Sequence, residues 1–259
     1  YYEEVNAFPS LQITEGELVA MLIAEKALEQ YRGTSFERPL VSALKKISES
    51  LPDTISFNLA DWEQTISFRT TVEPIIDLEI FDSIAKATAR HQQLRIEYRK
   101  PGRKQIEKRV VNPYHFANIN GEWFLFAFDL MREDVRTFVP GRIKSLAPTG
   151  ESFAPPKKFS LEQRLRDSFG VHSAEGEFDV VIHFNQLVAD YIREKRWHPS
   201  QKLSERPDGE LEMCLKLSSL GEVQRWIMTW GGNAVAIKPK ELVESVSSAA
   251  KGLLAAHGD

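Results

Sequence analysis

The sequence predicts an α+β protein in three parts: a helical N-terminal region, a small β-barrel and a C-terminal domain of the ferredoxin-like type. Apolar residues recur at helical spacing between residues 14 and 51. After Gln93 the period changes to two, and five short strands within about 50 residues favour a small, strongly bent barrel. From Phe178 onward the order of elements is β-α-β-β-α-β, with one extra helix.

The first region is expected to hold two amphipathic helices. Thr14 and Glu17 have the spacing of a capping box, and the apolar stripe that follows ends at Gly33. A second stripe, over residues 36–51, is closed by Pro52. Short helices of this kind must cover their stripes by packing on each other, on another domain or on a second copy of the chain.

An irregular or extended segment is expected over residues 53–73, with Ile66, Phe68 and Val72 as candidate strand positions. A third helix then begins near Pro74. The strands of the barrel are expected at residues 94–99, 106–111, 113–119, 123–128 and 135–139.

The fourth of these strands follows Asn120-Gly121, a two-residue hairpin signal that requires positive φ at both positions. Residues 123–128 alternate two apolar sets, so the strand has no polar face. Both of its sides should therefore be covered, one by its own core and one by something else. Residues 147–160, rich in Pro, Gly and Ser, are expected to form a linker.

The C-terminal domain is expected to alternate strands and helices around a turn at Pro207-Asp208-Gly209. Its strands are expected at residues 178–184, on both sides of that turn and at 234–237, and its helices at 187–196, 220–230 and 239–257.

Composition limits the function classes. The chain has 259 residues, 42% hydrophobic and 27% charged, which is typical of a soluble globular protein with two domains or more. No apolar run approaches the roughly 20 residues of a membrane span, and residues 1–10 lack the basic start and apolar stretch that a signal peptide has. The single cysteine, Cys214, excludes internal disulfides and multi-cysteine metal sites. We expect a cytoplasmic protein, and the start at Tyr1 suggests a fragment.

Charge is unevenly distributed. Between Ser83 and Ala147 there are thirteen Lys and Arg against six Asp and Glu, a net charge of +7, whereas the whole chain carries −4 and the remainder therefore −11. Such a segment favours anionic partners. A solvated sheet face explains the charge about equally well.

Motifs for catalysis are missing. The sequence has no Ser nucleophile elbow, no phosphate-binding Gly loop, no dinucleotide fingerprint and no His-Glu-x-x-His pair. Its six histidines are scattered without metal-ligand spacing. Cys214 is expected to be a small packing residue. We therefore expect no enzyme, no cofactor and no metal.

Several motifs together resemble the WYL-domain family of bacterial transcription regulators. The similarity lies in residues 121–125 (GEWFL) and 136–143 (RTFVPGRI), and extends to residues 94–98 and 109–114. Residues 230–234 and 239–242 are similar to the WCX extension of the same regulators. The chain departs from the family pattern at Phe124, where the family has tyrosine, and at residues 139–141, where Val-Pro-Gly replaces leucine-aspartate.

The resemblance implies four parts. Residues 1–80 would be a wing remnant, with Tyr1-Tyr2 at its end, and a helical linker and dimerisation region. Residues 81–148 would be a WYL domain, a Sm-like (SH3-type) barrel that senses an effector. Residues 149–175 would be a linker, and residues 176–259 a ferredoxin-like WCX domain. A winged helix-turn-helix outside this chain would bind operator DNA, and the protein would be a homodimer.

Candidate ligand-binding residues combine guanidinium groups with aromatic rings. Arg forks match phosphate oxygens bidentately, rings provide stacking surfaces for bases, and a histidine can add a pH-dependent charge. The candidates are Tyr98, Arg109, Tyr114, His115, Trp123, Arg136 and Arg142. Burial in the barrel core is at least as good an explanation for Trp123.

Three functions remain open from the sequence. The barrel could bind a nucleic-acid effector, including single strands, or a small anionic metabolite or nucleotide. Alternatively, the apolar hairpin with Phe124 and Phe126 could be a subunit interface in a pure protein-interaction module. Arginines that diverge into solvent, or that are neutralised by carboxylates of their own chain, would count against a polyanion cradle.

Overall fold

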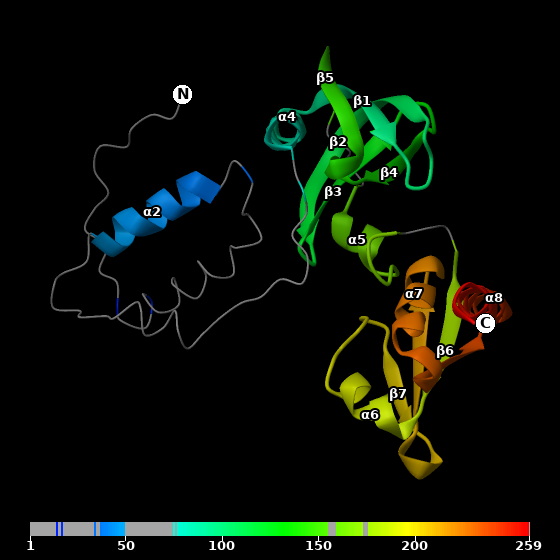
Figure 1. Ribbon diagram of the computed structural model, residues 1–259. Helices are drawn as coiled ribbons and strands as arrows, with labels where there is room; N and C mark the ends of the chain where they lie inside the picture. Colours follow the sequence, from blue (N-terminus) through cyan, green and yellow to red (C-terminus); the bar gives the residue numbers. More distant parts are fainter. Residues whose placement is uncertain are drawn as a thin grey trace. The chain divides into compact units, whose positions relative to one another are not determined.

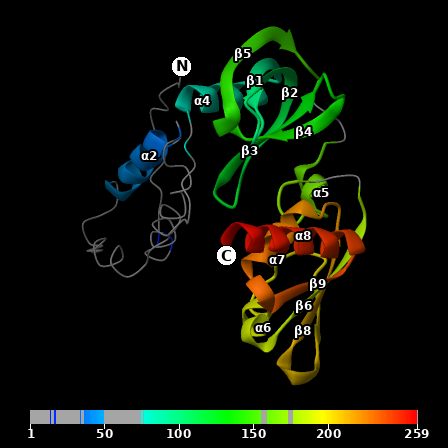
Figure 2. The same ribbon diagram turned by 45° about the vertical axis from the view of Figure 1, so that its right-hand side comes forward.

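The computed structural model describes residues 14, 17, 34, 37–49, 75, 77–154, 159–172 and 176–258 (Figures 1 and 2). The chain divides into two units, Tyr1–Pro155 and Pro156–Asp259. In the described ranges, no helix combines the length and the apolar character that crossing a membrane requires.

The capping box predicted near the N-terminus is confirmed. The Glu17 carboxylate accepts hydrogen bonds from the Thr14 amide at 2.8 Å and from its hydroxyl at 2.7 Å, and the Glu17 amide donates to Thr14 Oγ1 at 3.3 Å. Helix α2, Glu37–Glu49, lies within the second predicted helix. The rest of the first helix, the segment with Ile66, Phe68 and Val72 and the wing remnant at Tyr1-Tyr2 lie outside the described residues.

Helix α4, Leu78–Ala89, begins at an Asp77 cap rather than near Pro74. The Asp77 carboxylate accepts hydrogen bonds from the amides of Glu79 at 2.9 Å and Ile80 at 3.2 Å, which satisfies donors that the first turn leaves open. The buried side of α4 packs against strands β1, β2 and β5 of the adjoining sheet, as Figure 1 shows.

That sheet has five antiparallel strands in the order β4-β3-β2-β1-β5. The strands are β1 Gln92–Arg99, β2 Ile106–Ile119, β3 Glu122–Asp129, β4 Asp134–Phe138 and β5 Ile143–Ser152. The edge strands β4 and β5 are not paired with each other within the described residues, so the sheet is open. The α+β class is confirmed, and the segment predicted as a small, strongly bent barrel is an open five-stranded sheet.

Two strand boundaries also differ from the prediction. The segments at 106–111 and 113–119 form one strand, β2, which pairs with β1 up to Val111 and with β3 from Val111 onward. Pro113 interrupts neither ladder, because it lies beyond the last pair with β1 and beside a bulge. Residues 147–152, predicted as linker, belong to β5. This strand tolerates Pro148 because it is an edge strand.

The hairpin predictions are confirmed. Asn120 has φ 53° and Gly121 φ 86°, as a primed turn requires. Both faces of β3 are covered: Leu125 and Ala127 belong to the main core, while Phe124 and Phe126 on the other face are 6% and 0% exposed. Since these two side chains are buried within a single chain, their burial does not need a second subunit.

The second unit is a four-stranded antiparallel sheet with the order β7-β8-β6-β9. Its strands are β6 Phe178–Phe184, β7 Lys202–Glu205, β8 Leu211–Leu217 and β9 Ala234–Lys238. Its helices are α5 Leu161–Leu165, α6 Gln186–Arg193, α7 Gly221–Thr229 and α8 Lys240–His257. The predicted order β-α-β-β-α-β, with a helix added, is the order observed from β6 to α8.

Short 3-10 turns also occur within the described residues: η2 Pro140–Arg142, η3 Pro207–Gly209 and η4 Gly231–Asn233. In η3, Asp208 and Gly209 both have positive φ, which agrees with the predicted turn between β7 and β8. Alternate residues of β6 and β8 face the core with α6 and α7, and α8 lies beside α7 and β9 (Figure 2).

Cys214 lies half-buried on the other face of β8. Its thiol is 3.9 Å from Glu212 Oε1, and burial together with that carboxylate raises the pKa of the thiol. A raised pKa keeps the sulfur protonated and unreactive near neutral pH.

Candidate ligand-binding site

Strand register gathers charged side chains on the core face of the first sheet. Residues that are directly opposite in an antiparallel pair point to the same face. Arg109 lies opposite the core residue Ile96, and Arg136 lies opposite the core residue Ala127. Asp129 is paired with Val111 of β2 and with Asp134 of β4, so these three side chains point to the same face. The face is thus apolar under α4 and charged at its far end.

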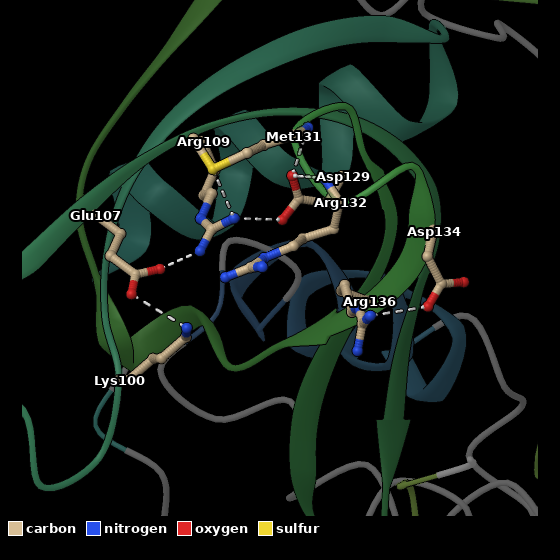
Figure 3. A network of polar contacts seen from close by, with 8 residues as sticks. All are labelled: Lys100, Glu107, Arg109, Asp129, Met131, Arg132, Asp134 and Arg136. Atoms are coloured by element: carbon tan, nitrogen blue, oxygen red, sulfur yellow. Dashed lines mark hydrogen bonds and ion pairs between the residues drawn. The ribbon is translucent and has the colours of Figure 1, made fainter. Parts of the chain in front are cut away.

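We call this group the charged cluster. It consists of Lys100, Glu107, Arg109, Asp129, Arg132, Asp134 and Arg136 (Figure 3). It contains four cationic and three carboxylate side chains, contributed by β2, β3, β4 and the loops next to β1 and β3.

Arg109 is the centre of the cluster and is only 5% exposed. Its Nη1 donates to Asp129 Oδ2 at 3.2 Å and lies 3.2 Å from Met131 Sδ, while Nη2 donates to Glu107 Oε2. Asp129 is equally buried, and its other oxygen accepts the amides of Met131 at 2.9 Å and Arg132 at 3.3 Å. Asp129 therefore fixes both the guanidinium and the loop after β3.

Glu107 connects the buried part of the cluster to solvent. Its Oε1 accepts a hydrogen bond from Lys100 Nζ at 3.1 Å, and its side chain is 31% exposed. The hydrogen bond from Arg109, and after it the one from Lys100, holds the pKa of Glu107 below its usual range. The carboxylate is therefore ionised at neutral pH.

The remaining arginines of the cluster are exposed. Arg136 Nη2 lies 3.2 Å from Asp134 Oδ2, with more than half of each side chain in solvent. An exposed pair of this kind contributes at most about 1 kcal/mol. Arg132 extends toward Arg109 and Glu107 in Figure 3, and its guanidinium forms no ion pair with any residue in the described ranges.

Two of the predicted ring residues lie in the core. Tyr98 is 7% exposed, packs edge-on against Phe138 at 5.1 Å and accepts a hydrogen bond from the Val139 amide at 3.3 Å. Trp123 is 6% exposed and packs edge-on against Phe81 at 4.9 Å. Neither ring presents an open stacking face in this structure.

Tyr114 and His115 point to the opposite face from Arg109. The bulge between Pro113 and His115 shifts the register, and His115 lies opposite Phe126. The Tyr114 ring stacks on Phe128 at 6.2 Å with an interplanar angle of 22°, and burial raises the pKa of its hydroxyl. His115 is exposed.

Arg142 ends η2, and within the described residues its guanidinium forms no ion pair with the charged cluster. Pro140 begins this turn, and the Arg142 amide donates to the Val139 carbonyl at 3.0 Å. The Val-Pro-Gly segment that departs from the family pattern thus forms a tight turn before β5. The Arg142 side chain is half-buried.

The structure brings Arg109 and Arg136 to one face and separates them from Tyr114 and His115. Both arginines are paired with carboxylates of their own chain, which counts against the open polyanion cradle expected from the sequence, so an anion can bind here only by displacing a carboxylate. Sequence reasoning missed Lys100, Glu107, Asp129, Arg132 and Asp134. Glu107 and Asp134 each carried a local signal: each stands two residues before an arginine on the same strand, and strand alternation places such residues on one face.

Two protein families match this chain, one in each of its two units. Residues 79–148 match the WYL domain family, and residues 176–254 match the WCX domain family. The whole charged cluster lies in the first match.

Relatives extend the similarity over most of the chain. Protein PafC of Mycobacterium tuberculosis, in strains CDC 1551 / Oshkosh and H37Rv, is 23% identical over 247 residues, which cover 95% of this chain and 72% of PafC. Proteasome accessory factor B/C (PafBC) of Arthrobacter aurescens is similar over 96% of this chain and 37% of its own, at 19% identity and a TM-score of 0.35.

A CRISPR Cas-related protein is similar over 69% of this chain and 51% of its own, at 13% identity and a TM-score of 0.47. This chain thus spans about a third to a half of the two solved structures, and both TM-scores are too low to establish a common arrangement. The two domain matches, in the order that the sequence motifs indicated, show that the chain contains a WYL domain followed by a WCX domain.

Proposed function

We propose that this chain is the effector-sensing and dimerising part of a bacterial transcriptional regulator, acting in the cytoplasm without catalysis. The effector is a nucleic acid, including single strands, or a nucleotide-like anion, and it binds at the charged cluster of the WYL domain. Occupancy changes the grip of a winged helix, outside this chain, on operator DNA. The observation that carries the proposal is the buried guanidinium of Arg109 beside three exposed cations.

The chemistry of the charged cluster favours phosphate. Asp129 holds the Arg109 guanidinium in a fixed orientation, and a fixed guanidinium can donate a charge-assisted hydrogen bond to a phosphate oxygen. Lys100, Arg132 and Arg136 are exposed and can adjust to the rest of a ligand. The exposed pair of Arg136 with Asp134 is weak enough to exchange for a phosphate contact.

The seven predicted residues take different parts in this proposal. Arg109 and Arg136 contact the ligand, while Tyr98 and Trp123 support the sheet beneath them. Tyr114, His115 and Arg142 lie outside the charged cluster.

The domain folds and the dimer are also part of the proposal. The sheet order β7-β8-β6-β9 and the order of elements support a ferredoxin-like WCX domain, and the five-stranded sheet supports an open Sm-like WYL domain. For a homodimer formed through residues 1–80 and the WCX domain, support comes from the last turns of α8, where Leu253 and Leu254 are 52% and 71% exposed.

Fluorescence anisotropy tests the function. Short single-stranded, duplex and mononucleotide probes are titrated at two salt concentrations with the wild type and with Arg136→Ala. Arg95→Ala is the matched control, since Arg95 is an exposed arginine on the opposite face of the same sheet. We expect saturable binding that Arg136→Ala weakens several-fold and Arg95→Ala leaves unchanged.

The salt series separates two ligand classes. A nucleic acid that contacts several phosphates loses affinity steeply with added salt, whereas a small anion or mononucleotide loses much less. Saturable binding to none of the probes would contradict the proposal and leave the protein-interaction module as the surviving alternative.

A further inference from the structure

We propose that Glu107 is a built-in competitor of the effector: its carboxylate occupies the anion position on Arg109 and Lys100, and a phosphate group must displace it to bind. This inference rests on the proposed function and adds how the site is controlled and which phosphate it accepts.

The two carboxylates on Arg109 differ in how they are held. Asp129 is 2% exposed and accepts two backbone amides in addition to the guanidinium, so it is a fixed part of the fold. Glu107 is 31% exposed, and in the described part of the chain its carboxylate is held by two side chains, Arg109 and Lys100. Glu107 is therefore the exchangeable partner.

An anion can reach the Arg109 guanidinium at the position that the Glu107 carboxylate now occupies. With only 5% of Arg109 exposed, one side of its fork is closed by Asp129 and by the Met131 thioether. On the other side, Nη2 donates to Glu107, which is itself part-exposed. An incoming anion can reach Nη2 where the carboxylate now lies.

The position that Glu107 occupies suits a phosphate. Its two oxygens bridge different cations, Oε2 to Arg109 and Oε1 to Lys100. Two oxygens of one phosphate can replace both contacts, and a third can point toward Arg132, whose side chain extends in the direction of Arg109 and Glu107 (Figure 3). Each replaced contact is a charge-assisted hydrogen bond.

Because a ligand must displace Glu107, the site favours ligands that carry more negative charge than one carboxylate. A singly charged group that replaces Glu107 exchanges one anion for another and gains no net attraction. A phosphate monoester carries a charge close to −2 near neutral pH, so it brings additional charge for Arg132 to bind. The site should therefore prefer a terminal phosphate monoester to a carboxylate or to a single phosphodiester.

Competition also sets the affinity. The observed dissociation constant is the intrinsic one divided by the fraction of molecules in which the site is open. Glu107→Gln removes the competing charge and should tighten binding roughly tenfold, the order of one charge-assisted hydrogen bond.

The experiment uses the full chain and a hexathymidylate with a 5′-phosphate and a 3′-fluorophore, followed by anisotropy. The matched control is Glu97→Gln. Glu97 is similarly exposed, at 35%, and lies 3.7 Å from Lys108 on the other face of the sheet. Both substitutions remove one negative charge, so a general electrostatic effect moves both equally.

A second variant, Glu107→Asp, keeps the charge but shortens the side chain by one methylene, which moves the carboxylate away from Arg109. It tests the competitor role if Glu107→Gln does not fold. We expect binding tighter than wild type by about threefold, since the contact is weakened and not abolished. Thermal melts of all three variants establish that they are folded. The 5′-hydroxyl form of the same oligonucleotide should bind more weakly than the phosphorylated form to each of them.

The outcomes separate the two proposals. If both Glu107 variants bind the phosphorylated oligonucleotide with the same dissociation constant as the wild type, the competitor role is overturned and the proposed function stands. Equal tightening by Glu97→Gln also overturns it, because the effect is then one of overall charge. Binding by no folded variant, with either probe, overturns both. Tightening confined to the Glu107 variants supports both.

Discussion

Arg109 and Arg193 each bind two carboxylates, and their surroundings are opposite. Arg109 of the WYL domain is 5% exposed and lies on the core face of its sheet, between Asp129 and Glu107. Arg193 of the WCX domain is 31% exposed, on the surface of α6, and contacts Asp190 and Glu205 at 2.6 Å each. The pairing chemistry is the same, but only the WYL arginine is removed from water.

The difference in burial distinguishes an ion pair that only stabilises the fold from one that belongs to a ligand-binding site. A surface ion pair stabilises a fold slightly, whereas a buried one is often no better than a well-packed apolar group. Burying Arg109 is therefore poorly explained by stability. A cation that is already desolvated and oriented is useful for binding an anion, which is how we interpret the WYL arrangement. The following substitutions test this comparison, from the largest expected effect to the smallest.

Asp129→Asn should destabilise the WYL domain most. The amide keeps the shape and an acceptor for the backbone amides of Met131 and Arg132, but it leaves Arg109 buried without its fixed counter-ion. We expect a loss of about 3–5 kcal/mol in the free energy of unfolding, measured with urea. A loss below about 1 kcal/mol would mean that Arg109 is hydrated after all.

Adding Arg109→Met to Asp129→Asn should restore much of that loss. No charge is then left uncompensated, and methionine fills a similar volume, so we expect the double variant within about 2 kcal/mol of wild type. The same double variant should not bind the 5′-phosphorylated hexathymidylate. Binding that survives in a folded double variant would place the ligand elsewhere.

Glu205→Gln removes one partner of the exposed Arg193 and should have a smaller effect. We expect a change in the free energy of unfolding far smaller than that of Asp129→Asn, because both side chains remain in contact with water. A loss as large as that of Asp129→Asn would remove the contrast between the two domains.

Acid should weaken the Glu107 contacts slightly. Since the folded-state pKa of Glu107 lies below its model-compound value of 4.5, its ionised form stabilises the fold above about pH 4.5, and this contribution is lost as the pH falls through the folded pKa. The melting temperatures of wild type and Glu107→Gln should therefore converge as the pH is lowered toward 3. A constant difference across that range would show that the charge of Glu107 contributes nothing.

The comparison also shows what the sequence could and could not reveal about the fold. Periodicity located α4, the hairpin at Asn120-Gly121 and most of the second unit, because those signals are local. It divided β2 at Pro113 and missed the part of β5 around Pro148, because whether a proline interrupts a strand depends on which neighbour pairs there. That information lies in distant parts of the chain.

The site was predictable only in part for the same reason. Residue type singled out Arg109 and Arg136, since guanidinium groups suit phosphate. Nothing local indicated that Asp129, twenty residues away, would hold Arg109, because the contact follows from the register between β2 and β3. Trp123 and Tyr98 look like stacking rings in the sequence, yet packing against the core removes both from solvent.

The most direct measurement is the Nε–Hε resonance of each arginine in a ¹⁵N-labelled chain during titration with the 5′-phosphorylated hexathymidylate. We expect the Arg109 resonance to shift saturably as the phosphate replaces Glu107, while the Arg193 resonance stays in place. An unmoved Arg109, or equal shifts at Arg109 and Arg193, would contradict the assignment of the buried WYL arginine as the anion site.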